Sequence, residues 1–187
     1  MIATTIYSQR DPRWANDHLG LPQASELSTI GAYGCAITAI AQKLTLLGFP
    51  TTPPDVQHAL AAGKAFKAYD TFNYVDWARI PIVYPQLMYN GREDYPSTPT
   101  PARVMEMIYS RLLRNDPVVI YVDASQYERG LQQHFVLAIG TLEGGDITIA
   151  NPWNGQMQTL RPYGKTDPIA ICGLKWLDLK FDEARAL

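Results

Sequence analysis

The chain has 187 residues, of which 47% are hydrophobic and 18% are charged, and its formal net charge at pH 7 is −2. This length and composition exclude a largely disordered chain and predict a single domain, residues 1–187, with its own hydrophobic core. No basic run could neutralise phosphates, so we expect no nucleic-acid partner. No apolar stretch approaches the ~20 residues of a membrane-spanning helix.

The N-terminal segment "MIATTIYSQRDPRW" has no positively charged segment followed by an apolar core, so it does not read as a secretory signal. We therefore expect the protein to be made in the cytoplasm, and to be released by other means, or carried on a virion, if it acts elsewhere. The two cysteines and three histidines show no zinc-type spacing. We expect no metal and no cofactor, and we expect Cys35 and Cys172 to be free thiols.

The first half of the chain shows helical patterns. After Cys35, apolar residues recur at helical spacing up to Leu47, and Gly48 then ends the pattern. The segment "TPPDVQHALAAG" predicts a second short helix, with proline near its start. Residues 64–101 are expected to be loops with one short helical turn near residues 75–78, and "ARVMEMIYSRLLRN" predicts a third helix.

The second half shows strand patterns. The short runs "PVVIYV", "HFVLAIG" and "DITIANPW" are rich in β-branched residues, and the "EGGD" between the last two indicates a hairpin turn. The segment "AICGLKWL" predicts a last strand. Helices followed by an antiparallel sheet indicate an α+β fold whose two halves pack on each other.

Cys35 stands where the first of these helices is expected to begin, after the sequence "GAYG". At that position a thiolate would face the positive end of the helix dipole and unpaired backbone amides, and we expect both to lower the pKa of the thiol. Gly31 and Gly34 would let the backbone approach closely. Taken alone, a cysteine at this position fits a small buried residue better than a nucleophile, and the assignment as a nucleophile depends on the residues that accompany it.

His134 is the best candidate for the base that such a cysteine needs. His18 falls in a loop-like region and His58 on an exposed helix, whereas His134 opens a predicted strand. Pairing across the predicted hairpin would bring Asn151 beside His134, where its side-chain carbonyl could accept the ring N–H and fix the tautomer. Asp123 is the one rival for orienting the imidazole, and Asn151 before proline also fits ordinary turn chemistry.

The segments "SQRDPRW", "GAYGCAITAIAQKL", "DPVVIYVDA", "HFVLAIG" and "ITIANPWNG" together resemble the double-glycine leader peptidase-like cysteine peptidases. This group of the papain superfamily includes the peptidase domains of bacteriocin-exporting transporters. The resemblance runs from about residue 7 to residue 155 and is weakest between residues 63 and 101. It implies a papain-like fold, with a helical N-terminal half carrying the nucleophile and a C-terminal antiparallel sheet.

The resemblance also implies roles for particular residues. The family's cysteine falls on Cys35 and its histidine on His134, and its oxyanion-hole glutamine falls on Gln9 in Gln-x-Asp-Pro-x-Trp. The usual third residue is aspartate, and Asn151 stands in its place, as asparagine does in papain-type enzymes. We therefore expect an amide hydrolase in which Cys35, His134, Asn151 and Gln9 form the catalytic set.

Two substrate classes follow from the resemblance: peptides cut after small residues such as Gly-Gly, and peptidoglycan peptides, as in phage endolysins. Acyl transfer on the same scaffold is an alternative, and so is a non-catalytic domain that binds a peptide, for example in a virion. Trp14, Trp77 and Trp153 are expected to be core or cleft-wall aromatics, and Cys172 a buried strand residue. The oligomeric state is left open.

Overall fold

The computed structural model describes residues 6–94, 102–124, 133–163 and 173–179. Its helical half contains α1 (Ile30–Tyr33), α2 (Cys35–Leu46), α3 (Pro53–Ala62), the 3-10 turn η1 (Trp77–Arg79) and α4 (Ile80–Val83). Helix α5 (Ala102–Leu112) and a second 3-10 turn, η2 (Arg161–Tyr163), follow later in the chain. The helices predicted at Cys35, in "TPPDVQHALAAG" and in "ARVMEMIYSRLLRN" are confirmed as α2, α3 and α5.

The strands form one antiparallel sheet in the order β1-β6-β2-β3-β4-β5. Their bounds are β1 Leu87–Asp94, β2 Val118–Asp123, β3 Gln133–Thr141, β4 Ile147–Asn151, β5 Gln156–Thr159 and β6 Gly173–Leu179. The predicted "EGGD" hairpin joins β3 to β4, and both of its glycines have positive φ (+90° and +85°), which a two-glycine turn supplies at low steric cost. The α+β, papain-like architecture is therefore confirmed.

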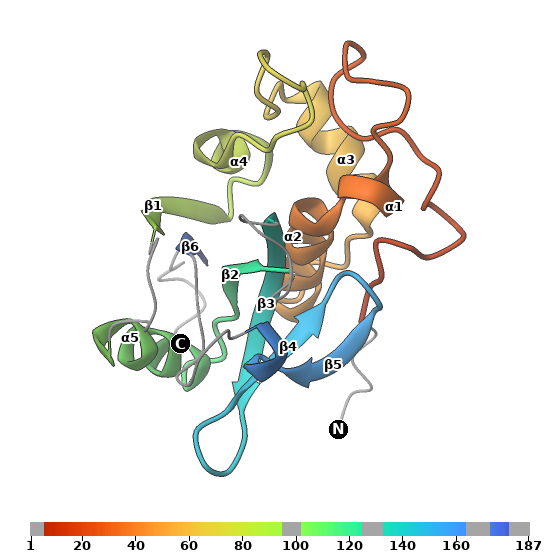
Figure 1. The fold of residues 1–187 in the computed structure, drawn as a ribbon. Helices are drawn as coiled ribbons and strands as arrows, with labels where there is room; N and C mark the ends of the chain where they lie inside the picture. The colour runs from red at the N-terminus through yellow and green to blue at the C-terminus, as the bar shows by residue number, and fades with distance from the viewer. Residues whose placement is uncertain (1–5, 95–101, 125–132, 164–172, 180–187) are drawn as a thin grey trace.

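The sheet is covered on both faces. On one face, Ala39 of α2 packs against Val119, Leu137 and Ala150 of the three central strands. On the other face, α5 buries Val104 and Ile108 against β2, β3 and β4. Figure 1 shows α2 running alongside β3, with the remaining N-terminal helices gathered at one end of the sheet. This packing fixes the N-terminus of α2, and hence Cys35, against the sheet.

Five elements were not predicted from the sequence. Strand β1 and helix α4 lie in the stretch that we expected to be loops, and α1, β5 and η2 had no clear pattern, whereas η1 lies near the turn expected at residues 75–78. The β1 sequence "LMYNGRED" is polar, and its pairing shifts register between Tyr89 and Arg92, around Gly91 at φ +100°. It forms because β6, some 80 residues later in the chain, pairs with it. A strand that depends on such a distant partner leaves little local signal.

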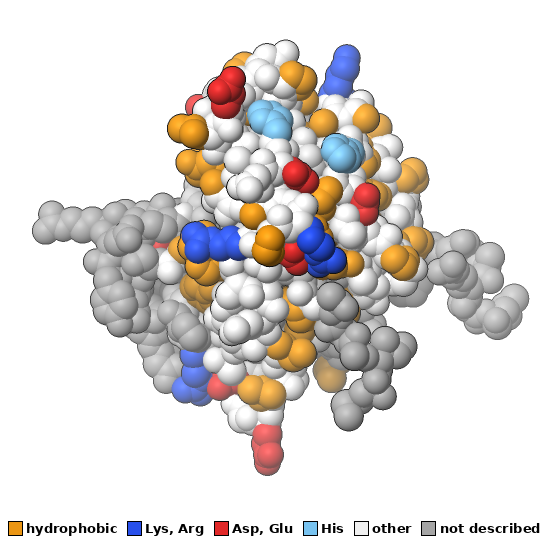
Figure 2. Space-filling model, turned by 90° about the vertical axis from the view of Figure 1, so that its right-hand side faces the viewer, with side chains coloured by type: hydrophobic (Ala, Val, Ile, Leu, Met, Phe, Trp, Pro, Cys, Tyr) orange, Lys and Arg blue, Asp and Glu red, His pale blue; other side chains and the backbone are white. Residues whose placement is uncertain are grey.

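The surface carries no broad field of one charge on the face shown in Figure 2, where basic, acidic and hydrophobic side chains of the described residues are interspersed. Recognition of a charged group on this face therefore depends on individual side chains. None of the helices in the described ranges is long and apolar enough to cross a membrane.

Candidate active site

Cys35 is the first residue of α2 and is partly accessible, and it forms no disulfide. The glycines before it allow two close approaches. A Cβ atom on Gly34 would meet the carbonyl oxygen of Ile30 at 2.4 Å, and one on Gly31 would meet that of Ala15 at 2.7 Å. Both contacts are with backbone, which cannot move aside easily. The glycines therefore bring α1 and the preceding loop tightly against the start of α2, as expected from the sequence.

The thiol of Cys35 lies against the sheet at the residue next to His134. Its sulfur accepts hydrogen bonds from the backbone N–H groups of Phe135, Ala36 and Cys35 itself, and these favour the thiolate. Burial acts in the opposite direction and is the larger effect, so it raises the pKa of the Cys35 thiol. The expectation of a lowered thiol pKa was therefore wrong, because the burial that places the sulfur at the backbone of β3 also removes water from it.

His134 and Asn151 meet as the hairpin predicts. The Nε2 atom of His134 lies 2.9 Å from Oδ1 of Asn151, and both side chains are buried. The same Oδ1 accepts the backbone N–H of Trp153 at 3.0 Å. Since a backbone N–H can only donate, the atom of Asn151 at this point must be the oxygen.

The orientation of Asn151 determines the tautomer of His134. An oxygen acceptor facing Nε2 requires that Nε2 carry the ring proton, so Nδ1 keeps its lone pair in the neutral imidazole. Burial lowers the pKa of His134, and the hydrogen bond to Asn151 partly offsets that effect. The neutral imidazole is therefore the resting form near pH 7, with Nδ1 as its basic atom.

Two residues that the sequence did not single out hold the amide of Asn151 in this orientation. Its Nδ2 donates to Oε1 of Gln158 at 3.2 Å and to the hydroxyl of Tyr163 at 2.6 Å. Tyr163 also packs on the imidazole, with ring centroids 5.8 Å apart. Gln158 comes from β5 and Tyr163 from η2, two elements whose positions depend on tertiary packing. No sequence pattern linked them to Asn151.

Asp123, the rival orienting residue, does not occupy that position. It pairs with Gln133 in the β2–β3 ladder, whereas Val122 pairs with His134. Successive residues of a strand point to opposite faces, so the Asp123 and His134 side chains leave the sheet on opposite sides. Nε2 of His134 is bound by Asn151 instead.

Gln9 links the two sides of the site. Its side chain is 1% exposed, its backbone N–H donates to the carbonyl of Pro152 at 2.7 Å, and its Nε2 donates to the carbonyl of Gly31 at 3.0 Å. It thus connects the β4 end that carries Asn151 with the helical segment before Cys35. An amide nitrogen has two hydrogens, so one N–H of Gln9 is left after the bond to Gly31.

Trp14, Trp77 and Trp153 occupy the kinds of position expected from the sequence, in the core or beside the candidate site. Trp14 is 4% exposed and belongs to the core, and Trp77 packs half-buried on Phe135. Trp153 is 44% exposed and stands edge-on to His134, with ring centroids 6.5 Å apart. It is therefore the aromatic wall next to the imidazole. Cys172, expected to be buried in a strand, lies outside the described residues.

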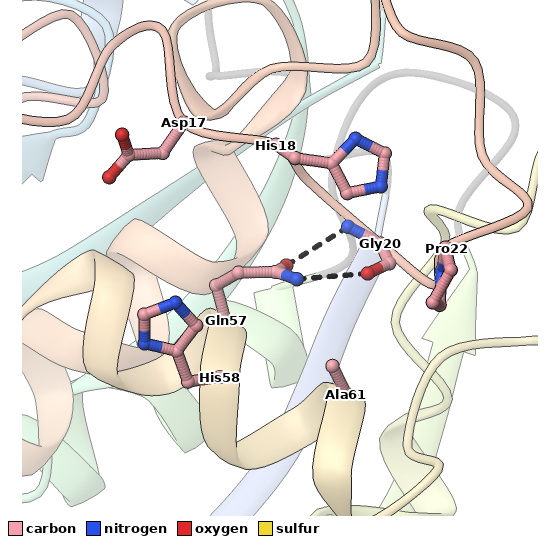
Figure 3. Close-up of a pocket in the computed structure, with 7 residues that line it drawn as sticks. All are labelled: Asp17, His18, Gly20, Pro22, Gln57, His58 and Ala61. Atoms are coloured by element: carbon pink, nitrogen blue, oxygen red, sulfur yellow. Dashed lines mark hydrogen bonds between the residues drawn. The ribbon is translucent and has the colours of Figure 1, made fainter.

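The other two histidines line a different cavity of about 420 Å³ (Figure 3). His18 lies on the loop before α1 and His58 on α3, and neither Cys35 nor His134 lines this pocket. The side chain of Gln57 spans its floor by pairing with both the N–H and the carbonyl of Gly20. Across the described ranges, no group of three or more His, Cys, Asp or Glu residues could hold a metal ion.

The α+β fold is consistent with the class of papain-like cysteine peptidases. The model of the Peptidase_C39 like family matches residues 3–178, which is nearly the whole chain. The chain therefore belongs to the Peptidase_C39 like family, and the resemblance noted in the sequence is confirmed. Comparison with curated proteins and with solved structures gave no match. Family membership supports cysteine peptidase activity and a peptide substrate.

Proposed function

We propose that the protein hydrolyses a peptide bond with Cys35 as the nucleophile and His134 as the acid and base. The observation that carries this proposal is the 2.9 Å contact between Nε2 of His134 and Oδ1 of Asn151, which leaves Nδ1 as the proton acceptor. The Cys35 sulfur lies at the backbone N–H of Phe135, the residue that follows His134. The bond between His134 and Asn151, and the position of the Cys35 sulfur beside the residue that follows His134, support the assignment of a nucleophile, a base and a group that orients the base.

The resting pair is neutral, because burial raises the thiol pKa and lowers the imidazole pKa. In the proposed reaction, Nδ1 of His134 takes the proton of the Cys35 thiol as the sulfur bonds to the substrate carbonyl carbon. The carbonyl π electrons move to its oxygen and give a tetrahedral oxyanion. As the C–N bond breaks, the imidazolium returns the proton to the leaving amine, and an acyl-enzyme remains.

The acyl-enzyme is then hydrolysed by the reverse sequence. Water attacks the thioester carbon while His134 takes its proton, and collapse of the second tetrahedral intermediate releases the carboxylic acid and the thiol. The second Nε2 hydrogen of Gln9 and the backbone N–H of Cys35 are the proposed oxyanion donors. Such donors already point at the place where the negative charge develops. The protein therefore does not have to reorganise as the oxyanion forms, and this makes the donors effective in a buried site.

For the substrate, we propose peptides cut after small residues such as Gly-Gly, or peptidoglycan peptides, including action as a phage endolysin. The family relationship supports a peptide, and the choice between these two groups is made by a substrate screen. A screen with Gly-Gly peptides and purified cell walls, followed by mass analysis of the products, would identify the bond that is cut. An added amine nucleophile in the same assay would reveal acyl transfer by the mass of its adduct.

The test of the proposal is the loss of cleavage in Cys35→Ala and in His134→Ala, with the unfolding temperature of each variant measured as a control for folding. We expect both to lose cleavage and to unfold cooperatively. Wild-type turnover in either folded variant would contradict the mechanism. A biological effect that survives Cys35→Ala would instead favour the non-catalytic peptide-binding alternative.

A further inference from the structure

Arg10 lies at the rim of the proposed active site. Its guanidinium carbon is 3.3 Å from the centroid of the Trp153 ring, so the cation is stacked on the aromatic face. Trp153 in turn stands edge-on to His134. The Arg10 side chain is exposed, so a ligand in solvent can reach it. The Trp153 ring lies between Arg10 and the imidazole of His134, the proposed base.

The backbone fixes Arg10 at this place. Its N–H donates to Oγ of Ser8 at 3.1 Å, and the same Oγ donates to the carbonyl of Trp153 at 3.5 Å. The preceding residue, Gln9, is bonded to the carbonyl of Pro152. The segment that carries Arg10 is therefore held to the segment that carries Trp153 by two hydrogen bonds, from Ser8 and from Gln9.

A second arginine in the same segment is also stacked on a tryptophan, and its guanidinium binds a carboxylate. Arg13 lies over Trp14, with its guanidinium carbon 4.5 Å from the ring centroid. The edge of that guanidinium binds both carboxylate oxygens of Asp11, with Nε–Oδ1 at 2.9 Å and Nη2–Oδ2 at 2.7 Å. Stacking uses the face of a guanidinium and leaves its edge for a bidentate carboxylate.

The guanidinium of Arg10 is stacked on Trp153 in the same way, but it binds no carboxylate of the described residues. Within the described part of the chain, no Asp or Glu pairs with Arg10, whose only side-chain interaction is with Trp153. The N–H groups at the edge of the Arg10 guanidinium can therefore donate hydrogen bonds to a carboxylate of another molecule. The preference for a carboxylate would then come from this one side chain.

The position next to His134 indicates which part of a substrate reaches Arg10. In the proposed reaction His134 gives its proton to the leaving amine, so the leaving fragment passes on the His134 side of the scissile bond. Trp153 forms the wall on that side. An extended peptide advances by at most ~3.6 Å per residue, so the first two residues of the leaving fragment are those within reach of the wall.

We propose that Arg10 and Trp153 form a subsite that binds a carboxylate in the first residues of the leaving fragment. The inference rests on the proposed peptidase function and extends it to a substrate class: peptides in which an acidic side chain or a free terminal carboxylate follows closely after the bond that is cut. Arg10 is then a specificity-determining residue, and the Trp153 face holds its guanidinium in place.

The test compares matched peptides that differ only in the leaving fragment. Asp is compared with Asn at the first and second positions, and a free terminal carboxylate is compared with its amide, so that the two sources of carboxylate are separated. We expect kcat/KM to be about ten-fold higher for the acidic member of at least one pair, chiefly through KM. In Arg10→Ala that ratio should fall to about one.

Arg13→Ala is the matched control, because it removes a stacked arginine whose edge is already occupied by Asp11. We expect the ratio to be retained in this variant. An unchanged ratio in Arg10→Ala, or no preference in the wild-type protein for any acidic member, would overturn the proposal. Equal loss of cleavage for the acidic and neutral peptides in Arg10→Ala would also overturn it, since it would show a purely structural role.

A binding measurement separates this inference from the proposed chemistry. Dipeptides with Asp at either position, with and without a terminal amide, are titrated calorimetrically into the protein and into its Arg10→Ala variant. We expect carboxylate-dependent binding that is lost in the variant. Absence of that binding would overturn the subsite, whereas binding without any peptide cleavage would contradict only the proposed hydrolase function.

Discussion

Helix α2 has a buried polar cluster at each end, and the two clusters are built differently. At its start, the Cys35 sulfur lies at the backbone N–H of Phe135, the residue after His134, and the thiol, the imidazole and the Asn151 amide are uncharged in the resting state near pH 7. Toward its end, the ammonium group of Lys43 is 2% exposed and is bound to Asp116 at 2.7 Å and to the carbonyl of Pro117. Arg111 joins Asp116 to Asp178 in the same network.

The comparison shows how buried polar groups can serve two purposes in one helix. The Lys43 cluster pairs its full charges within the protein, so it ties α2 to α5 and β6. The Cys35 cluster leaves Nδ1 of His134 and one N–H of Gln9 without a fixed role in the fold. Buried charges must be paired to be tolerated, whereas neutral groups can be kept available for a substrate at lower cost.

Among changes that keep both Cys35 and His134, the largest effect on the reaction is expected from Gln9→Ala. If the Gln9 amide donates to the oxyanion, its loss should lower kcat about 10²–10³-fold, as for removal of other oxyanion donors. KM should change little, because the interaction forms mainly in the transition state. The measurement is steady-state kinetics on the peptide identified by the screen. An unchanged kcat with a higher KM would show that Gln9 positions substrate and does not stabilise the oxyanion.

The opposite end of α2 is tested by Lys43→Met. This change keeps the aliphatic bulk but leaves the carbonyl of Pro117 without its donor and Asp116 with only Arg111. We expect a loss of about 3 kcal/mol in the free energy of unfolding and a fall of about 10 °C in Tm. The pH profile of kcat/KM should keep its shape. A shifted profile with unchanged stability would show that this cluster acts on the reaction.

The smallest effect is expected from Asn151→Asp, which exchanges a neutral orienting group for a charged one. A carboxylate beside the imidazole stabilises its protonated form, so the pKa of His134 should rise from its lowered wild-type value. The acid limb of kcat/KM marks loss of the neutral base, so activity should begin to fall at a higher pH than in the wild type. NMR titration of the imidazole in the Cys35→Ala background checks the direction, and an unchanged titration would contradict it.

Part of the site followed from local sequence. The meeting of His134 and Asn151 was predicted because a two-glycine hairpin sets which residues of neighbouring strands pair. Cys35 at the start of α2 was predicted because helical spacing and the preceding glycines mark that boundary. Both features depend on residues close together in the chain.

The remaining features depend on distant contacts. Gln9 was assigned by resemblance alone, and its bonds to Gly31 and Pro152 join segments far apart in sequence. The hydrogen bonds of Asn151 to Gln158 and Tyr163 depend on where β5 and η2 pack, and the raised pKa of Cys35 depends on burial of its sulfur in the folded protein. Strand β1 was missed for the same reason, because its partner β6 lies at the other end of the chain.

The most direct test of the central claim is the rate of alkylation of Cys35 by iodoacetamide across a range of pH, located by peptide mass spectrometry. This reagent needs no knowledge of the substrate. His134→Ala is measured beside the wild type, and the rate at high pH shows whether the sulfur is accessible in both. If His134 accepts the thiol proton, the wild type should react at least about ten-fold faster than the variant near neutral pH.

The two rates should converge only above the raised pKa of the Cys35 thiol, where hydroxide removes the proton without help. Equal rates for the wild type and His134→Ala at every pH, or a Cys35 that stays unreactive even at high pH, would contradict the account. The first result would show that His134 does not act on the thiol, and the second that Cys35 is a structural residue.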